Sequence, residues 1–363
     1  MSTILSITTD RKKGGIATAL ASYSAALDRH HHRHIVLLPS NAVAAAMLSG
    51  MSGVRLITMP APAIRFHLMT GAIFHAELRA AIGDADVFFV HNASLAPMAR
   101  RFRKPVCLIS HSGKLRHLEA ADHAVFLSRA ASSRAAEATV NLRTDAPQLH
   151  IIPHGFPPYE CRPGPTKPDD TVRVMAAGRF VQKKGFEVLL EAAELLQRHR
   201  AGIQFDIYGD GPLKPELDAI IGRLGLGNVV FHGWQEPLDQ AFAAADLFCL
   251  PSIEEPFGLV IGEAMGRGLP MVATRTDGPL DVIGHEGTIQ EQTLSAGGLL
   301  VEPGDAAGLA QALAELAGNR DRLARTGEAA RRRIVADFSM DALADRLDRL
   351  IATTIQRRPA TPW

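Results

Sequence analysis

The 363-residue sequence lacks any apolar run long enough to cross a membrane, and it has few cysteines, few aromatic residues and almost no net charge. A membrane-spanning helix needs about 20 consecutive apolar residues, and the first residues also lack the basic and apolar regions of a signal peptide. The three cysteines, Cys107, Cys161 and Cys249, are odd in number and far apart. This spacing excludes a disulfide framework and a zinc pattern. We therefore expect a globular protein of the cytoplasm.

The charge that is present is divided unevenly along the chain. Residues 1–168 contain 19 Lys and Arg against 10 Asp and Glu, whereas the remainder contains 20 and 28. Twelve of the 15 histidines also lie in the first part. A basic amino-terminal part suits an anionic partner, such as a phospholipid surface or a phosphate-bearing acceptor. The alternative is that the two halves of the chain attract one another.

Short apolar runs alternate with longer helical patterns rich in Ala and Leu, such as 16–27, 94–102 and 187–199. This alternation predicts parallel sheets covered by helices on both faces. Two such series give an α/β fold of two doubly wound, Rossmann-like domains. The expected strands are 4–9, 34–38, 54–58, 86–90, 106–110, 124–128 and 149–153, then 172–178, 204–209, 228–232, 246–250, 270–274 and 298–302.

A segment dense in proline and glycine separates the two series. It predicts an interdomain linker at 156–170. The expected domains are therefore 1–155 and 171–339. The helical pattern at 340–357 is expected to pack back on the first domain.

Ligands of doubly wound sheets bind at the carboxyl ends of the strands, so the loops there are the candidate sites. One such loop, residues 178–185, follows the strand at 172–178. In it, Arg179 and Lys184 add positive charge beside the unpaired N–H groups of a helix that begins near Gly185. This combination is typical of a diphosphate clamp. The alternative is a solvated basic loop.

A second loop carries two carboxylates around a predicted helix start. Pro256 favours an extended Glu255 just ahead of the helix, and Gly258 and Leu259 fall where free backbone amides can hold a phosphate. Glu263 lies about one helical turn further on. Carboxylates accept hydrogen bonds from vicinal hydroxyls, as on a ribose or a hexose. The alternative places Glu255 in a turn and Glu263 on a helix surface.

Together these segments resemble the retaining glycosyltransferases of family 4, which have the GT-B architecture of two Rossmann-like domains facing across a cleft. Glu255 and Glu263 match the family's Glu-x7-Glu signature, and residues 178–185 match its Gly-Arg-x4-Lys-Gly element. The resemblance is specific over 172–305 and weaker, though readable, over 1–155. Further matching segments are IYGDGP at 207–212, NVVFHGW at 228–234 and AADLFCLPS at 244–252.

The resemblance implies transfer of a hexose-type sugar from a nucleoside-diphosphate-sugar, with retention of anomeric configuration. The implied acceptor is a lipid-linked or envelope glycan of the lipopolysaccharide or exopolysaccharide type. The amino-terminal domain would bind the acceptor and the carboxy-terminal domain the nucleotide-sugar. No cofactor and no metal are expected, because Arg and Lys neutralise the diphosphate. No nucleic-acid partner is expected either.

The same resemblance implies a role for each candidate residue. Glu255 would bind hydroxyls of the donor sugar and Glu263 those of the ribose, while Arg179 and Lys184 would bind the diphosphate. The glycine loop before residue 16 would approach the donor phosphates, and a histidine after the strand at 106–110 would face the reacting sugar. The candidate catalytic residues are His111, Glu255, Arg179 and Lys184; the candidate donor-binding residues are Gly14, Gly15, Arg179, Lys184, His232, Gly233, Glu255, Phe257, Gly258, Leu259 and Glu263.

Lys13 belongs to that glycine loop, and Lys114, Arg116 and His117 follow the candidate histidine. These three basic residues would suit an anionic acceptor or form an exposed helix start. His91 and Asn92 end another strand and are secondary candidates.

Two features that imitate metal sites are set aside. His30, His31, His32 and His34 fall between a helix and a strand, with no fixed geometry and no partner carboxylate. Asp84-Ala85-Asp86 imitates a metal-binding DxD motif but precedes its strand instead of following it.

Rival functions share the predicted fold. A nucleotide-sugar epimerase or a phosphorylase would use the same paired domains, and a non-catalytic module would bind a nucleotide or a membrane without turnover. The basic segment 99–104 also predicts peripheral attachment to the inner face of a membrane. The alternative is an enzyme with a basic face and no membrane contact.

Overall fold

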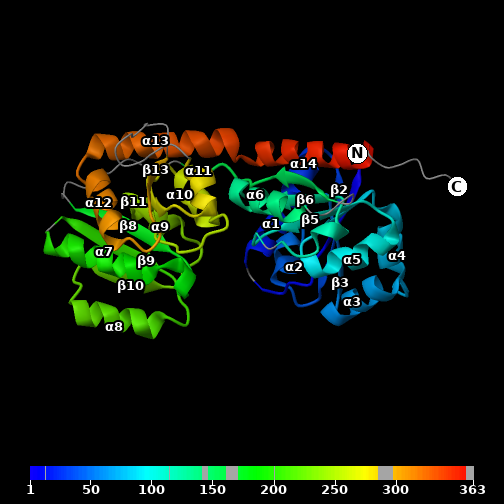
Figure 1. The fold of residues 1–363 in the computed structure, drawn as a ribbon, viewed down its shortest axis with the longest axis horizontal. Helices are drawn as coiled ribbons and strands as arrows, with labels where there is room; N and C mark the ends of the chain where they lie inside the picture. The colour runs from blue at the N-terminus through cyan, green and yellow to red at the C-terminus, as the bar shows by residue number, and fades with distance from the viewer. Residues whose placement is uncertain are drawn as a thin grey trace. The chain divides into compact units, whose positions relative to one another are not determined.

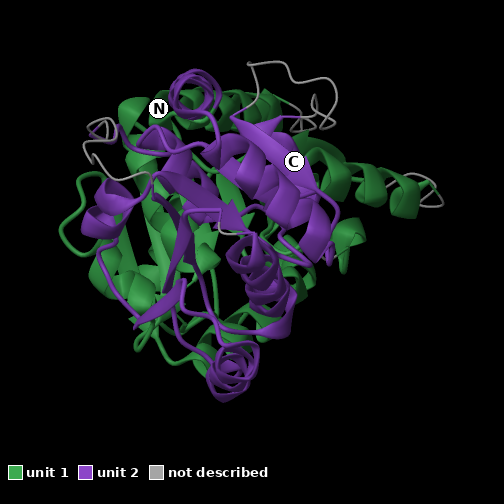
Figure 2. Cartoon of the chain, turned by 90° about the vertical axis from the view of Figure 1, so that its left-hand side faces the viewer, with its two compact units in different colours: residues 1–155, 338–363 green, residues 156–337 purple. Residues whose placement is uncertain are grey.

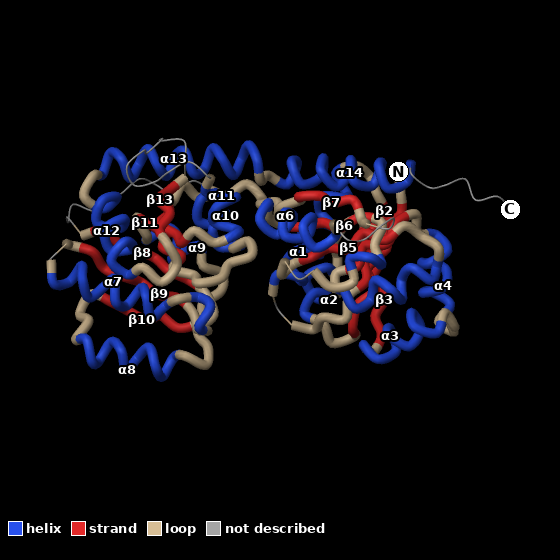
Figure 3. Tube along the Cα trace, viewed as in Figure 1, coloured by secondary structure: helices blue, strands red, loops and turns tan. Residues whose placement is uncertain are grey.

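The computed structural model describes residues 1–12, 14–113, 115–140, 146–160, 171–199, 201–284 and 297–356. The chain divides into two compact units, which Figure 2 shows in green and purple. Unit 1 comprises residues 1–155 and 338–363, and unit 2 comprises residues 156–337. Each unit contains one parallel sheet with helices around it (Figure 3). Cys161 and residues 161–170 of the expected linker lie outside the described residues.

Unit 1 is built on seven parallel strands in the order β3-β2-β1-β4-β5-β6-β7, of which Figure 1 labels β2, β3, β5 and β6. The strands are β1 (Thr3–Ile7), β2 (Arg33–Pro39), β3 (Val54–Met59), β4 (Val87–Val90), β5 (Val106–Ser110), β6 (His123–Phe126) and β7 (Gln148–Ile151). One face is covered by α1 (Gly15–Arg29), α2 (Val43–Leu48) and α14 (Met340–Gln356). The other is covered by α3 (Ala61–Thr70), α4 (Ala76–Asp84), α5 (Ala96–Ala99) and α6 (Arg129–Thr139).

Unit 2 is built on six parallel strands in the order β10-β9-β8-β11-β12-β13. The strands are β8 (Val172–Ala177), β9 (Ile203–Tyr208), β10 (Val229–Gly233), β11 (Leu247–Leu250), β12 (Met271–Thr274) and β13 (Gly298–Val301). One face packs on α7 (Phe186–Arg198), α8 (Lys214–Leu224) and α12 (Ala306–Ala317). The remaining helices are α9 (Asp239–Ala244), α10 (Leu259–Gly266), α11 (Asp277–Ile283) and α13 (Arg320–Asp337).

The predicted α/β fold is confirmed. Each of the 13 expected strands is present, and its first and last residues differ from the expected ones by no more than two positions. The strands form because their apolar runs are buried on both faces, as in sheets that carry helices on each side. The predicted helix at 94–102 is wrong as a single element. It is a 3₁₀ turn at Ala93–Leu95, the one-turn helix α5 and a second 3₁₀ turn at Arg100–Phe102. Pro97 explains the break, because proline fits only the first turn of a helix.

The strand order of each sheet reverses once. In unit 1 the strands step outward from β1 to β3 on one side and from β4 to β7 on the other. In unit 2 the reversal lies between β8 and β11. The loops after the two central strands lie at the carboxyl edge of the sheet, where ligands of such folds bind.

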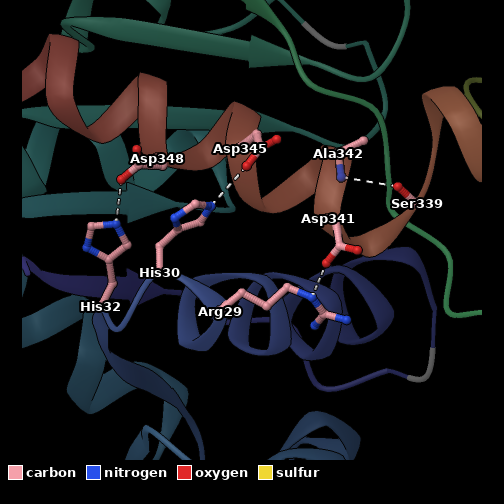
Figure 4. A network of polar contacts seen from close by, with 8 residues as sticks. All are labelled: Arg29, His30, His32, Ser339, Asp341, Ala342, Asp345 and Asp348. Carbon is pink, nitrogen blue, oxygen red and sulfur yellow. Dashed lines mark hydrogen bonds and ion pairs between the residues drawn. The ribbon is translucent and has the colours of Figure 1, made fainter.

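Three polar contacts hold helix α14 to the end of α1 and to the residues between α1 and β2, and Figure 4 shows the paired side chains pointing toward one another. They are Arg29 with Asp341 at 2.6 Å, His30 with Asp345 at 3.1 Å and His32 with Asp348 at 3.0 Å. The helix begins with Ser339, whose side chain accepts a hydrogen bond from the Ala342 N–H. The prediction that these histidines have no partner carboxylate is therefore wrong for His30 and His32. Their partners lie more than 310 residues away in the sequence.

His32 is the buried member of this group. Its side chain is 6% exposed, and its Nδ1 accepts a hydrogen bond from the Ser2 N–H. The Nε2–H therefore points at Asp348, which is its acceptor. By contrast, the Arg29 and Asp341 side chains are 40% and 83% exposed.

We expect Asp348→Ala to lower the free energy of unfolding by about 1–3 kcal/mol, because it leaves a buried N–H without an acceptor. Asp348→Asn keeps an acceptor oxygen and should cost less. Asp341→Ala is the matched control on the same helix and should cost less than about 1 kcal/mol, since exposed ion pairs contribute little. Urea unfolding measures all three. Equal losses for Asp348→Ala and Asp341→Ala would contradict the expectation.

Candidate functional site

Two loops of unit 2 meet beside the reversal between β8 and β11. The loop after β8 contains a 3₁₀ turn at Gln182–Lys184, and the loop after β11 begins at Pro251. The Lys183 carbonyl accepts hydrogen bonds from the N–H groups of Ile253 and Glu254 at 2.8 and 3.1 Å. Gly185 has the left-handed φ of 64°, and a Cβ added there would overlap the Pro251 carbonyl oxygen. Glycine is required at this position for both reasons.

This close approach brings Lys184 and Glu255 together. The Lys184 ammonium forms an ion pair with Glu255 Oε2, and the two side chains are 21% and 8% exposed. Ser252, which is fully buried, donates a hydrogen bond from Oγ to the same carboxylate oxygen at 3.3 Å. Burying a carboxylate is costly unless it is paired and hydrogen-bonded, and both conditions are met here.

The backbone around Glu255 is fixed by residues at the end of β12 and in the segment that follows it, which the sequence did not indicate. The Thr274 hydroxyl donates to the Ser252 carbonyl at 2.5 Å, and the Gly278 N–H donates to the Glu255 carbonyl at 2.9 Å. A Cβ at Gly278 would overlap the backbone of Phe257. Loops from three adjacent strands therefore hold Glu255 in place.

Helix α10 begins at Leu259, with Gly258 ahead of it at a φ of 81°. The free N–H groups of its first turn and its positive dipole end are suited to an anion. The Phe257 side chain, however, is buried and stacks on Phe156 with ring centroids 6.2 Å apart. A ligand contact from Phe257 would therefore come from its backbone.

Glu263 lies in the middle of α10 and is half-buried. Burial raises the pKa of its carboxyl, an effect that nearby Arg267 opposes and that Asp239 and Glu236 reinforce. The Arg267 guanidinium donates to the Glu263 backbone carbonyl at 3.0 Å and also pairs with Asp239.

The other two predicted parts of this site lie at the ends of β8 and β10, the strands on either side of β9. Arg179 is exposed in the loop after β8. His232, near the end of β10, donates a hydrogen bond from Nε2–H to the Asp206 carboxylate at 2.7 Å and stacks on Tyr208 with ring centroids 4.5 Å apart. Gly233 follows with a φ of 71°. Asp206 and Tyr208 alternate with apolar residues in β9, a signal that could have marked them as partners of the next strand.

The candidates in unit 1 flank the reversal between β1 and β4. Gly14 precedes α1, which begins at Gly15. Asn92 accepts hydrogen bonds from the Thr8 hydroxyl at 2.9 Å and the Thr9 N–H at 2.7 Å, and so ties the loops after β1 and β4 together. Lys13 and Lys114 lie outside the described residues.

His111 follows β5 directly, and its Nε2 lies 2.9 Å from Nδ1 of His91, which follows β4. Burial lowers the pKa of His111 to about 4, although the Asp10 carboxylate acts in the opposite direction. The imidazole is therefore neutral near pH 7. His91 was a secondary candidate from sequence, and the structure makes it the direct partner of His111.

Comparison with known proteins gives a family match for part of the chain. Residues 171–319 match the model of the family Glycosyl transferases group 1. The matched residues lie in unit 2. The lipopolysaccharide core biosynthesis glycosyltransferase LpsE of Rhizobium meliloti is 35% identical over 187 residues, which are 51% of this chain and 51% of LpsE. The chain thus matches about half the length of this curated relative.

The solved structures of glycosyltransferases share the fold over nearly the whole chain. A glycosyltransferase from Rickettsia africae has a TM-score of 0.78 at 18% identity, covering 98% of this chain and 99% of its own. HepE from Anabaena, in complex with UDP-glucose, has a TM-score of 0.74 at 21% identity, covering 97% and 100%. The fold is therefore the GT-B fold that the sequence predicts.

Among the described residues, no group of three or more His, Cys, Asp or Glu side chains could hold a metal ion. Metal independence of the reaction stays a prediction. None of the helices in the described part of the chain is long and apolar enough to span a membrane.

We expect Glu263→Gln to stabilise the unliganded protein increasingly as pH rises above 4.5, the ordinary pKa of the group. Because the native carboxyl has the higher pKa, it keeps its proton after the unfolded chain has lost its own. The wild type therefore loses free energy of unfolding as pH rises through the native pKa, and glutamine does not. Urea unfolding of both proteins between pH 4 and pH 8 measures the difference. A difference that is constant with pH would contradict the raised pKa.

Proposed function

We propose that the chain is a retaining, metal-independent glycosyltransferase that moves a hexose from a nucleoside-diphosphate-sugar to a glycan or glycolipid acceptor. The observation that carries this proposal is the pairing of Lys184 with the buried Glu255 beside the amino-terminal end of α10. A cation, a carboxylate and a helix start at one strand reversal supply partners for a diphosphate and for sugar hydroxyls. The domain match over residues 171–319 supports the same conclusion.

Lys184 can serve both partners at once. An ammonium has three N–H donors, so one can hold Glu255 while the others face phosphoryl oxygens. Breaking the bond between the anomeric carbon and the phosphate leaves negative charge on the departing nucleoside diphosphate. Lys184, Arg179 and the amides at Gly258 and Leu259 would stabilise that charge, which is an effect realised mainly in the transition state.

Glu255 and Glu263 would divide the hydroxyls of the donor between them. Glu255 is held by Lys184 and Ser252, so its free lone pairs accept from a sugar positioned at the diphosphate. Glu263 lies one turn along α10 from Leu259 and would accept from the ribose. His232 and Gly233 would lie beside the base.

The acceptor is proposed from the curated relatives. LpsE is named as an enzyme of lipopolysaccharide core biosynthesis, and an envelope glycan of this kind is the acceptor proposed for this chain, at the cytoplasmic side of the membrane. An epimerase acting on the free nucleotide-sugar, a phosphorylase and a non-catalytic module are the alternatives. An epimerase would convert the nucleotide-sugar with no acceptor present.

We expect Lys184→Ala to lower turnover by at least about 10²–10³-fold, the usual loss when one donor to a developing charge is removed. Lys183→Ala is the matched control, because the Lys183 side chain is exposed and only its backbone carbonyl contacts the neighbouring loop. The assay measures release of nucleoside diphosphate from UDP-, GDP-, ADP- and dTDP-sugars with lipopolysaccharide-core acceptors. A Lys184→Ala protein with near wild-type turnover would refute the clamp.

A membrane surface is the second proposed partner. In the basic segment 99–104, Arg100 and Lys104 donate hydrogen bonds to backbone carbonyls of unit 1. These two side chains are therefore engaged within the unit. Exposed apolar side chains lie elsewhere, at Phe66 on α3 and at Phe74, which are 48% and 75% exposed and which both contact the His67 ring. Exposed aromatic side chains favour binding at the interface of a bilayer.

We expect the wild type to co-sediment with phosphatidylglycerol-containing vesicles at low salt, and Phe66→Ser/Phe74→Ser to bind roughly tenfold more weakly, a change of about 1.4 kcal/mol. Val335→Ser, which removes an exposed apolar residue of α13 in unit 2, is the control and should bind like the wild type. Absence of co-sedimentation by the wild type would overturn the membrane proposal.

A further inference from the structure

A row of hydrogen-bonded side chains crosses the sheet of unit 1 on the face that α1 covers. Ser24 Oγ lies 2.8 Å from His34 Nδ1, and His34 Nε2 lies 2.7 Å from Ser6 Oγ. Ser6 Oγ lies 3.3 Å from His91 Nε2, and His91 Nδ1 lies 2.9 Å from His111 Nε2. The row runs from α1 over β2 and β1 to the ends of β4 and β5, which are adjacent strands. It links the core of the unit to a candidate site residue.

The direction of each hydrogen bond is fixed from the Ser24 end. The Ser24 hydroxyl lies 2.8 Å from the Leu20 carbonyl oxygen, which can only accept, so the hydroxyl donates there. Its remaining contact, His34 Nδ1, must then be the donor to Ser24 Oγ. A neutral imidazole has one donor and one acceptor nitrogen. His34 Nε2 is therefore an acceptor.

The same reasoning carries through to His111. The Ser6 hydroxyl donates to His34 Nε2, so it accepts from His91 Nε2–H. The other nitrogen of His91 is then an acceptor, and it takes the Nε2–H of His111. Each tautomer in the row follows from the one before it. His111 is left with its lone pair on Nδ1.

The argument requires neutral rings, and burial provides them. Burial lowers the pKa of His34 to about 3 and that of His111 to about 4, and it lowers the pKa of His91 well below its ordinary value. The ionisable groups that act on His91 are His111, His34 and His154, and the Tyr23 ring packs against it at 6.0 Å. Asp10 is the charged group that favours a cation at His111, and burial outweighs it.

The Nδ1 atom at the end of the row is buried and has no hydrogen-bond partner among the described residues. A buried acceptor left unpaired is unfavourable, and a ligand hydroxyl would supply the missing partner. His111 lies at the carboxyl edge of the sheet, one strand from the reversal at β1 and β4.

We propose that Ser6 and His91 are positioning residues that hold His111 as its Nε2–H tautomer and so present Nδ1 as an acceptor to a substrate hydroxyl. The part that concerns substrate rests on the proposed function. The tautomer itself does not depend on it. A fixed acceptor at His111 selects a sugar or acceptor that offers an O–H at that point, because an analogue without the hydroxyl leaves Nδ1 unpaired.

Long-range ¹H–¹⁵N spectra of ¹⁵N-histidine-labelled full-length protein at pH 7 test the tautomers directly, with peaks assigned by single His variants. We expect the Nε2–H form for His91 and His111 and the Nδ1–H form for His34. Two histidines serve as references in the same spectrum. His67 Nδ1 lies 2.8 Å from the Ala72 carbonyl and must be Nδ1–H, whereas His32 accepts at Nδ1 and must be Nε2–H. An Nδ1–H form of His111 would overturn the proposal.

Variants separate positioning from folding. His91→Gln keeps one acceptor and one donor, so His111 should keep its tautomer. His91→Phe and Ser6→Ala break the row, so His111 should become a mixture of forms. Ser112→Ala is the matched control, since Ser112 is exposed and next to His111 in the chain. An unchanged His111 in both His91→Phe and Ser6→Ala would also overturn the proposal.

Substrate binding tests the His111 end of the row. In His111→Asn an amide oxygen stands near the Nδ1 position, whereas His111→Gln retains only the contact to His91. In titrations with UDP-, GDP-, ADP- and dTDP-glucose, we expect His111→Asn to keep affinity within about threefold and His111→Gln to lose about tenfold. The reverse order contradicts an Nδ1 acceptor. If no nucleotide-sugar binds the wild type, the proposed function fails while the tautomer result still decides the positioning role.

Discussion

The reversal of strand order in each parallel sheet is the constraint on which both candidate sites depend. The loops after the adjacent strands β8 and β11 contact each other at the carboxyl edge of the sheet, where ligands of such folds bind. Lys184 comes from one loop and Glu255 from the other. The two loops can pack together because Gly185, which has no side chain, lies directly against the Pro251 carbonyl oxygen. The ion pair between Lys184 and Glu255 therefore depends on the adjacency of β8 and β11 and on the glycine at position 185.

The two units solve the problem of buried polar groups differently. Unit 2 buries a charged carboxylate and compensates it with a cation and the Ser252 hydroxyl. Unit 1 buries His34, His91 and His111, which stay neutral because burial lowers their pKa values. Hydrogen bonds with Ser24 and Ser6 fix which ring nitrogen carries the proton. A charged pair suits the binding of a diphosphate, which needs a cation. A neutral, directed row suits the recognition of hydroxyl groups, which need a donor or an acceptor in one place.

The features that could be predicted from the sequence are those that depend on neighbouring residues in the chain. The apolar runs give all 13 strands, and Gly258 followed by Leu259 marks the start of α10 where the structure has it. Contacts between segments that are far apart in the sequence could not be predicted in this way. Asp348 meets His32 across 316 residues, and Ser6 meets both His34 and His91 because three strands happen to be neighbours. Thr274 and Gly278 were missed for the same reason, since their role lies in the backbone of another loop.

Binding of a nucleotide-sugar to the native protein is the central claim, and a thermal-shift measurement tests it most directly. A ligand that binds only the folded state raises the melting temperature in a saturable way. We predict such a rise with at least one of UDP-, GDP-, ADP- or dTDP-linked hexoses and none with the free hexoses, which lack the diphosphate for Lys184 and Arg179. No rise with any of the four nucleotide-sugars at millimolar concentration would contradict the account.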